Sequence, residues 1–330
     1  MTKQPNLRQR LIKPTMDPQK LQHFLSVYDT GSFSRAAKSN NVSQQAVSKS
    51  VAKLEEGLAV KLFDRSTYGA EPTNFGHALA RRAKVITAET RLAAAEISAL
   101  RGADRGYVRI GLGWSFLTRI APIIINRFSE KQPGITLSIT SGDSKSLYQK
   151  LLQGDVEFVA SAPPSEMQAD EAIERHALFE DRDVIMMRRD HPLSKKTDVT
   201  LEDLVSQTWL LSLQLKEQWE RICSVFLGAG LTPPAKYIDI DSVILAKSTL
   251  LNSDCVMVMA RELAASQTER DQFHFIEETP FPISRTAYFA TRRNSSLQPV
   301  AQSLQNELLV ACRSTLGISQ LRGLTATGQT

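Results

Sequence analysis

The chain has 330 residues, 42% of them hydrophobic and 23% charged, which is enough for two or three domains with sizeable cores. Its formal net charge of +5 is uneven, because residues 1–105 hold 17 Lys and Arg against 9 Asp and Glu, whereas the remainder holds 23 against 26. A basic first third beside a mildly acidic remainder favours a polyanion partner at one end only. Three widely spaced cysteines, Cys223, Cys255 and Cys312, argue against a disulfide framework and a zinc site.

Residues 1–15 are polar and basic, so we expect a mobile tail there and no secretory signal. Translation from Met16 is an open alternative. No apolar run has the length of a membrane span, and we therefore expect a cytoplasmic protein without a membrane partner.

Motifs of the common enzyme classes are absent: the sequence has no Gly-rich phosphate loop, no GxSxG elbow and no CxxC pair. Five histidines lie scattered without metal or triad spacing: His23, His77, His176, His191 and His274. We therefore expect no enzymatic activity, no metal and no cofactor.

The first helices are marked by their caps. Asp17-Pro18 is a cap and first-turn pair that predicts a helix start, and Thr30-Gly31-Ser32 ends this helix and begins the next. Asn40-Asn41 predicts a turn, because Asn tolerates left-handed backbone angles. Ser43 follows as an expected N-cap, since its hydroxyl can accept a hydrogen bond from a first-turn N–H group.

The helix after Ser43 is the most informative element. Val47, Val51 and Leu54 recur at helical spacing and form its expected buried face. The opposite face exposes polar side chains that can contact base edges and phosphates: Gln44, Gln45, Ser48 and Lys49. Together with a hairpin wing expected within residues 61–75, these helices predict an all-α winged helix-turn-helix over residues 16–76, which places its second helix in a DNA groove.

Residues 77–102 continue as one long linker helix. Two interleaved sets of small or apolar residues recur every seven positions along it: Leu79, Ile86, Ala93 and Leu100, and Ala83, Thr90 and Ile97. This a/d-type seam favours pairing with a second copy, and packing on the helix's own domain is the alternative. A dimer of DNA-binding heads suits a two-fold DNA site.

Gly102–Gly106 predicts a hinge, after which strand-like and helix-like segments alternate over residues 106–316. Strands are expected at 107–112, 136–140, 156–160, 184–187, 209–212, 235–240, 255–259 and 285–290. Helices are expected at 117–131, 145–153, 201–205, 218–229, 243–251 and 299–316. This alternation indicates a parallel α/β architecture in two lobes joined by two crossovers, and residues 317–330 are expected to be disordered.

One set of residues matches a known family closely: Phe24, Gly31-Ser32-Phe33, Ala36-Ala37, the run Ser43 to Lys49, Leu54-Glu55-Glu56, Leu62-Phe63-Asp64-Arg65, Thr73 and Gly76. Over these residues the chain resembles the LysR-type transcriptional regulators. A weaker match continues to about residue 313 through Gly154-Asp155, His191-Pro192-Leu193 and Arg292-Arg293.

The resemblance implies a multidomain protein with a winged helix-turn-helix, a dimerising linker helix and a two-lobed effector domain like a periplasmic binding protein. It implies a sequence-specific regulator controlled by a small-molecule effector bound between the lobes. It also implies a homodimer or homotetramer on double-stranded promoter DNA, with RNA polymerase as a further partner. Activation and repression both stay open.

The resemblance also implies roles for single residues of the DNA-binding head. Side chains expected at the major groove or at nearby phosphates are Arg35, Ser43, Gln44, Gln45, Ser48, Lys49 and Thr73. Arg65 is expected to reach the minor groove or its phosphates, and a surface ion pair with Asp64 or Glu71 is the alternative. The family often has Pro at position 45 and Arg at position 49, and Lys49 offers a point charge where Arg can bind two acceptors.

Polar and small residues follow the expected strands, where ligands of α/β proteins commonly bind. The candidate effector-binding residues are Ser115, Phe116, Ser141, Gly142, Ser144, Ser161 and Pro163 in the first lobe, and Leu211, Ser212 and Asp241 in the second. Ser115 and the N–H groups beside it suit a polar or anionic ligand atom. Some family members place an Arg near position 163, and its absence here leaves a neutral ligand such as a sugar open. For each serine, a helix N-cap without a ligand role is the alternative.

Two further classes remain as alternatives. A solute-binding protein for transport suits the two lobes, but not the basic head or the missing signal. A thiol-based redox sensor would need a cysteine beside a basic cluster, and neither Cys223 nor Cys255 has one.

Overall fold

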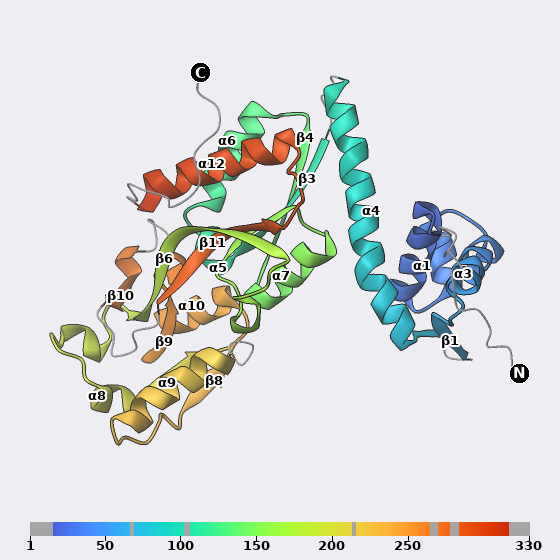
Figure 1. Ribbon diagram of the computed structural model, residues 1–330. Coiled ribbons are helices and arrows are strands. Elements are labelled where there is room, and N and C mark those ends of the chain that lie inside the picture. Colours follow the sequence, from blue (N-terminus) through green and yellow to red (C-terminus); the bar gives the residue numbers. More distant parts are fainter. Residues whose placement is uncertain are drawn as a thin grey trace, which may run out of the picture. The chain divides into compact units, whose positions relative to one another are not determined.

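The computed structural model describes residues 16–66, 69–101, 106–212, 216–264, 270–277 and 284–316. The chain forms two compact units, shown in Figure 1: an N-terminal unit of residues 1–106 with 149–156, and a C-terminal unit of residues 107–148 with 157–330. Both expected tails, and residues 102–105 of the expected hinge, lie outside the described residues.

The N-terminal unit contains α1 (Pro18–Thr30), α2 (Phe33–Ser39), α3 (Gln44–Leu58), β1 (Phe63–Ser66), β2 (Gly69–Pro72) and α4 (Asn74–Leu100). The expected caps are confirmed. Asp17 accepts a hydrogen bond from the Gln19 N–H group, and Gly31 ends α1 in the left-handed conformation with φ 62°. Asn41 also has a positive φ of 54°, which turns the chain between α2 and α3.

One core holds α1, α2, α3 and the wing together. Phe24 of α1 is fully buried, and its ring centroid lies 5.3 Å from that of Phe63 at the start of β1. Val47, Val51 and Leu54 line the inner face of α3 with no exposed surface, as their spacing predicts. The short hairpin β1–β2 is antiparallel, so the winged helix-turn-helix is present.

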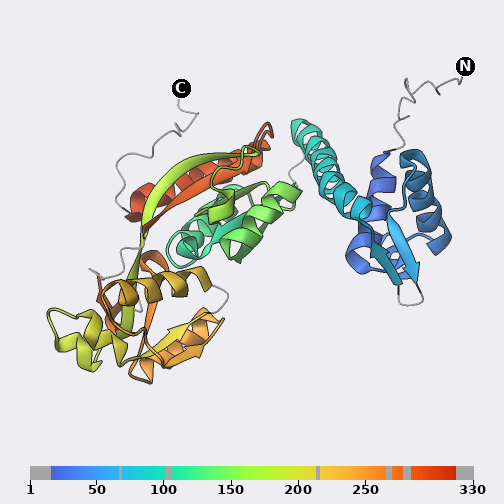
Figure 2. The same ribbon diagram turned by 60° about the horizontal axis from the view of Figure 1, so that its bottom comes forward.

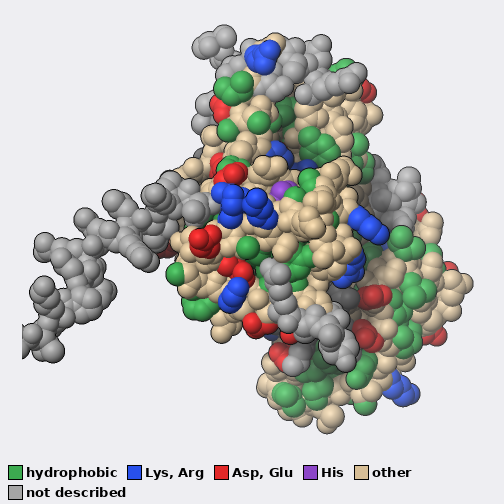
Figure 3. All heavy atoms as spheres, turned by 90° about the vertical axis from the view of Figure 1, so that its right-hand side faces the viewer, with side chains coloured by type: hydrophobic (Ala, Val, Ile, Leu, Met, Phe, Trp, Pro, Cys, Tyr) green, Lys and Arg blue, Asp and Glu red, His purple; other side chains and the backbone are tan. Residues whose placement is uncertain are grey.

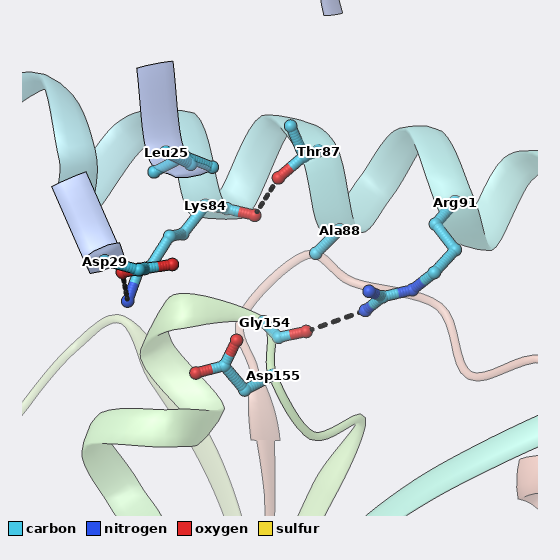
Figure 4. Close-up of a pocket in the computed structure, with 8 residues that line it drawn as sticks. All are labelled: Leu25, Asp29, Lys84, Thr87, Ala88, Arg91, Gly154 and Asp155. Carbon is cyan, nitrogen blue, oxygen red and sulfur yellow. Dashed lines mark hydrogen bonds and ion pairs between the residues drawn. The ribbon is translucent and has the colours of Figure 1, made fainter. Parts of the chain in front are cut away.

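The predicted seam of helix α4 is buried in its first part and exposed further along. Its first turns pack on the unit's own core, where Leu79 and Ala83 are buried. Lys84 then reaches Asp29 of α1, with 3.8 Å between Nζ and Oδ1 (Figure 4). Further along, Ile86 is 38% exposed and Ile97 is 58% exposed. The alternative of packing within the domain is therefore right for the first heptad, while Ile86, Thr90, Ala93 and Ile97 are left exposed by the part of the chain that the structure describes.

The C-terminal unit begins with a first lobe. It contains β3 (Gly106–Gly113), α5 (Trp114–Leu117), α6 (Ala121–Lys131), β4 (Ile135–Gly142), α7 (Ser144–Gln153) and β5 (Phe158–Ser161), and later β11 (Ser284–Arg292) and α12 (Pro299–Leu316). The second half of α7, residues 149–153, is grouped with the N-terminal unit. The single helix expected over residues 117–131 is wrong, because α5 and α6 are separate. Pro122 stands in the first turn of α6, where its missing N–H group is tolerated. Within a helix continuing from α5 the same proline would remove a backbone hydrogen bond and clash with the preceding turn.

The second lobe contains β6 (Ile173–Arg188), α8 (Leu201–Val205), β7 (Thr208–Leu211), α9 (Lys216–Gly228), β8 (Tyr237–Asp239), α10 (Val243–Leu251), β9 (Cys255–Ala260), α11 (Arg261–Ala264) and β10 (Phe273–Ile276). Short 3-10 turns, η1 (Ser165–Met167), η2 (Pro192–Lys195) and η4 (Arg270–Gln272), join some of these elements. Each lobe buries its own apolar cores, and both views of the molecule show the two lobes (Figures 1 and 2).

The strands of the C-terminal unit follow the order β4-β3-β5-β11-β6-β9-β7-β8, with β10 also paired to β6. Pairing is parallel between β3 and β5, and between β7 and both β8 and β9. The parallel expectation is wrong for β6 and β11, which run antiparallel to their neighbours. These two strands carry the chain between the lobes in opposite directions, so they pair with each other from Ile173–Arg292 to Arg182–Ser284.

Candidate functional sites

The first candidate site is the outer face of α3. Gln44, Gln45 and Lys49 are exposed and Ser48 is half-buried, on the side opposite Val47. Donors and acceptors on an exposed helix face of this kind can contact base edges and phosphates. Figure 3 faces the N-terminal unit and shows Lys and Arg side chains there beside a few Asp and Glu.

Ser43 and Arg35 are predicted contact residues that also have partners within the protein. The Ser43 hydroxyl accepts a hydrogen bond from the Ala46 N–H group at 3.2 Å, which makes it the N-cap of α3. The Arg35 guanidinium, which is exposed, donates to the Thr30 carbonyl. Their contacts with DNA stay predictions.

The wing is fastened to α3 by a buried carboxylate that the sequence motif contains but whose role was not predicted. Glu55 is only 6% exposed. Its Oε1 accepts hydrogen bonds from the N–H groups of Leu62 at 2.8 Å and Phe63 at 3.4 Å, and its Oε2 lies 3.2 Å from Lys61 Nζ. The last turns of α3 therefore set the position of the first residues of the wing.

The other side of the wing is held by α4. The Thr73 hydroxyl donates to the Lys61 carbonyl at 2.7 Å and accepts from the Gly76 N–H group at 3.1 Å. Thr73 thus caps α4, and its predicted contact with the DNA backbone stays a prediction. Arg65 stands in β1 opposite Ala70, while its side chain lies outside the described residues.

The second candidate site lies at the ends of β3 and β5. The Ser144 and Ser161 hydroxyl oxygens are 3.1 Å apart, and the Tyr148 hydroxyl donates to the Ser161 carbonyl at 3.2 Å. A Cβ atom at Gly113 would come within 2.5 Å of Ser161 Oγ, so only glycine fits there. The structure thus brings the ends of two parallel strands and the start of α7 together, as predicted.

The remaining candidates are less closely grouped. Phe116 is fully buried with its ring centroid 5.3 Å from that of Phe179, so it packs in the first-lobe core without a free face for a ligand. Ser141, Gly142 and Pro163 follow β4 and β5, and Leu211, Ser212 and Asp241 follow β7 and β8. Among the described residues, no side-chain hydrogen bond joins these six to Ser115 or Ser144. Their ligand roles stay predictions.

Ser115 has a partner that the sequence analysis missed. Its hydroxyl donates to Oδ2 of Asp181, a side chain on β6 with 1% of its surface exposed. Asp183 lies two residues further along the same strand and is also buried. Arg285 of β11 lies across from both, with its Nη2 2.8 Å from Asp183 Oδ1 and 3.6 Å from Asp181 Oδ2. We call Ser115, Asp181, Asp183 and Arg285 the crossover cluster.

The crossover cluster is asymmetric. Asp183 has two donors, because Gln218 of α9 also donates to its Oδ2 at 2.8 Å. Asp181 Oδ1 has no hydrogen-bond partner among the described residues. Burial raises the pKa of the Asp181 carboxyl above its usual range, while Arg285 and the Ser115 hydroxyl act in the opposite direction. A period-two signal exists in the sequence, since Asp181 and Asp183 alternate with the exposed Glu180 and Arg182.

The same region connects the two lobes. The Thr118 hydroxyl donates to the Glu262 carbonyl at 2.6 Å, and Arg119 Nη1 lies 2.6 Å from Glu262 Oε2. Trp114 packs against the core of the second lobe. The segment that carries Ser115 therefore contacts both lobes.

The described residues give less support to a metal site or a reactive cysteine. Among the described residues, no group of three or more His, Cys, Asp or Glu is placed to hold a metal ion. Burial raises the pKa of Cys312 to about 12 and also raises that of Cys223, which disfavours the reactive thiolate. Over the same part of the chain, no helix has the length and apolar character needed to cross a membrane.

Comparison with known proteins settles the family. A family model described as the LysR substrate binding domain matches residues 101–313. A second, described as the bacterial regulatory helix-turn-helix protein of the lysR family, matches residues 18–77. The chain belongs to the LysR family. This LysR-type chain is a transcriptional regulator with a DNA-binding and an effector-binding domain, as the sequence resemblance implied.

Individual relatives agree with this assignment. The HTH-type transcriptional regulator GbpR of Azospirillum brasilense is 28% identical over 254 residues, covering 77% of this chain and 74% of GbpR. A full-length OxyR variant from Pseudomonas aeruginosa shares the fold with a TM-score of 0.65 and 21% identity, over 96% of this chain and 99% of OxyR. Full-length CbnR in complex with its target DNA shares it with a TM-score of 0.59 and 20% identity, over 90% and 100%.

Proposed function

We propose that this LysR-type regulator recognises a partly palindromic promoter site through α3, with the wing beside it. Gln44, Gln45, Ser48 and Lys49 would face the major groove, and Arg65 would reach the minor groove or its phosphates. The observation that carries this proposal is the exposed polar face of α3. The opposite face of the helix is buried through Val47, Val51 and Leu54, and Glu55 joins the helix to the wing.

The oligomer is the second part of the proposal. Each half of a two-fold site needs its own head, and the exposed seam of α4 with Ile86 and Ile97 offers a surface for pairing with a second copy. We propose a homodimer that assembles further into a homotetramer in the cytoplasm, acts on RNA polymerase at the promoter and has no enzymatic activity of its own.

The effector would bind between the lobes of the C-terminal unit, where the ends of β3 and β5 meet. The linked Ser144 and Ser161 support this position, as does the segment with Ser115 that contacts both lobes. A ligand that binds one arrangement of the lobes more tightly than another shifts the population of oligomer geometries, which can change how DNA is held.

The experiment that tests this function is genome-wide capture of DNA bound by the purified full-length protein at physiological salt. Discrete sites with two-fold symmetry are expected, because two heads read two half-sites. Binding that is indifferent to sequence and only sensitive to salt would overturn the proposal and reduce the head to a generic basic surface. A variant of the α3 face such as Lys49→Ala should lose sites in this capture. Lys236→Ala, which removes an exposed Lys from a loop of the second lobe, is its matched control.

A further inference from the structure

The crossover cluster holds a buried acceptor without a donor. Asp181 Oδ2 is used by Ser115, while Oδ1 is shielded from solvent and has no partner among the described residues. Buried carboxylate oxygens in folded proteins are normally hydrogen-bonded, because leaving one without a donor is costly. An acceptor of this kind can be completed by a donor that arrives with a ligand.

The charges around Asp181 are also unbalanced. The acidic groups that act on it are Asp183 and Glu262, and the basic group is Arg285. Arg285 is closer to Asp183 than to Asp181, at 2.8 Å against 3.6 Å, and Glu262 is already paired with Arg119. One negative charge of the cluster therefore lacks a counter-charge of its own, and burial makes this costly.

Asp181 stands where an effector would be sensed. It lies on β6, one of the two strands that carry the chain between the lobes, and its neighbour Ser115 belongs to the segment that contacts both lobes. A ligand group bound to Asp181 would therefore lie beside the segment that contacts both lobes.

We propose that the effector carries a cationic nitrogen, of the amine or guanidine type, that donates a hydrogen bond to Oδ1 of Asp181. This inference rests on the proposed effector site and adds the chemical class of its ligand. Such a nitrogen supplies both the missing donor and the missing positive charge. A carboxylate at this position would meet Asp181 and Asp183 with repulsion, so the anionic ligand suggested by Ser115 alone is disfavoured.

The first arm of the test needs no ligand and compares the thermal unfolding of full-length variants. Asp181→Asn removes the uncompensated charge and keeps an acceptor for Ser115, so its Tm should equal or exceed that of the wild type. Asp183→Asn is the matched control, because it weakens a carboxylate with two donors and should lower Tm. An equal drop in both variants would overturn the proposal, since Asp181 would then be a structural partner of Arg285.

The second arm uses two sets of probes with matched skeletons: 1,4-diaminobutane, butane-1,4-diol and succinate, and glucosamine, glucose and glucuronate. The proposal expects an amine to raise the Tm of the wild type by several degrees, and its alcohol and acid counterparts to have no such effect. Asp181→Asn should lose this shift, and Asp198→Asn, at an exposed position, should keep it.

The proposal is overturned if no amine raises the Tm of the wild type more than its alcohol and acid counterparts do. It is also overturned if Asp181→Asn keeps the same rise in Tm. Footprints on a captured promoter site, recorded for the wild type and Asp181→Asn, keep the two proposals apart. If the wild type gives discrete footprints but amines do not raise its Tm, only the proposal of a cationic effector is wrong. Loss of discrete footprints in the wild type removes the proposed function itself.

Discussion

Glu55 Oε1 accepts the N–H hydrogen of Leu62 at 2.8 Å and thereby joins the end of α3 to the start of the wing. Both groups are buried, so removal of the carboxylate would leave the Leu62 N–H group without a partner. Glu55 is therefore one of the side chains that set the position of the wing relative to α3.

We expect Glu55→Ala to lower the free energy of unfolding of the N-terminal unit by about 1–3 kcal/mol, the cost of one unsatisfied buried donor. DNA affinity should fall as well, because the wing loses its fixed position. Urea unfolding and fluorescence anisotropy on a captured promoter site measure the two effects. Glu56→Ala, at the exposed next position, is the control and should change neither. Equal behaviour of the two variants would show that Glu55 does not hold the wing.

Gly76 predicts a second effect at the same junction. A Cβ atom there would come within 2.3 Å of the Leu62 carbonyl oxygen, so the backbone must shift. We expect Gly76→Ala to destabilise the protein by about 1–3 kcal/mol, as overpacked sites do. Gly142→Ala is the control, because a Cβ there has open space within 4 Å, and its effect should stay within about 0.5 kcal/mol. Urea unfolding decides, and a smaller loss for Gly76→Ala than for Gly142→Ala would contradict the steric argument.

The elements predicted well from the sequence are those set by neighbouring residues. Asp17-Pro18, Gly31 and Ser43 act through hydrogen bonds or backbone angles within a few positions, and all three do in the structure what their residue types predict. The limits of α10 and α12 also agree with the predicted ranges. Local chemistry is sufficient for such boundaries.

The features that the sequence does not predict depend on contacts between residues far apart in the chain. The sequence predicts a strand only over residues 184–187, yet β6 begins at Ile173, because its pairing with β11 sustains it through polar residues such as Glu174 and Arg175. The carboxylate of Asp181 was missed for a related reason. Its partners Ser115 and Arg285 are 66 and 104 positions away in the sequence, and only the fold brings them together. The candidate serines were found because strand ends can be located from the alternation of elements alone.

The α3 face predicts a specific change in salt dependence. Lys49→Ala and Arg65→Ala should each weaken DNA binding and reduce the slope of log affinity against log salt by about 1, because each loses about one phosphate contact. Anisotropy titrations over a range of salt concentrations measure the slope. Lys236→Ala should leave it unchanged. A wild-type slope and affinity in both variants would remove these two residues from the DNA interface.

The buried carboxyl of Asp181 predicts a pH effect on stability. Its folded-state pKa is raised above the ordinary 3.8, because burial outweighs the opposing effects of Arg285 and Ser115. The folded state therefore binds this proton more tightly, and the corresponding stability is present below pH 3.8 and is lost as pH rises through the folded pKa. Asp181→Asn has no proton to lose.

We therefore expect the difference in unfolding free energy between Asp181→Asn and the wild type to move in the variant's favour as pH rises above 3.8. Urea unfolding at a series of pH values measures it. Asp198→Asn, at an exposed position, should follow the wild type. A difference that is constant over the whole pH range would contradict a raised pKa at Asp181.

The divided seam of α4 predicts how the oligomer responds to mutation. Ile97 is 58% exposed within a single chain, far from the buried Leu79 and Ala83 that hold the helix on its own unit. If a second copy covers this part of the seam, a charge placed there would have to be buried without a partner. Ile97→Asp should thus shift the protein toward monomers and weaken binding to a two-fold site, while the isolated head stays folded. Glu96→Ala, at the exposed preceding position, should leave the assembly unchanged. Sedimentation velocity measures the assembly, and an unchanged oligomer for Ile97→Asp would place the pairing surface elsewhere.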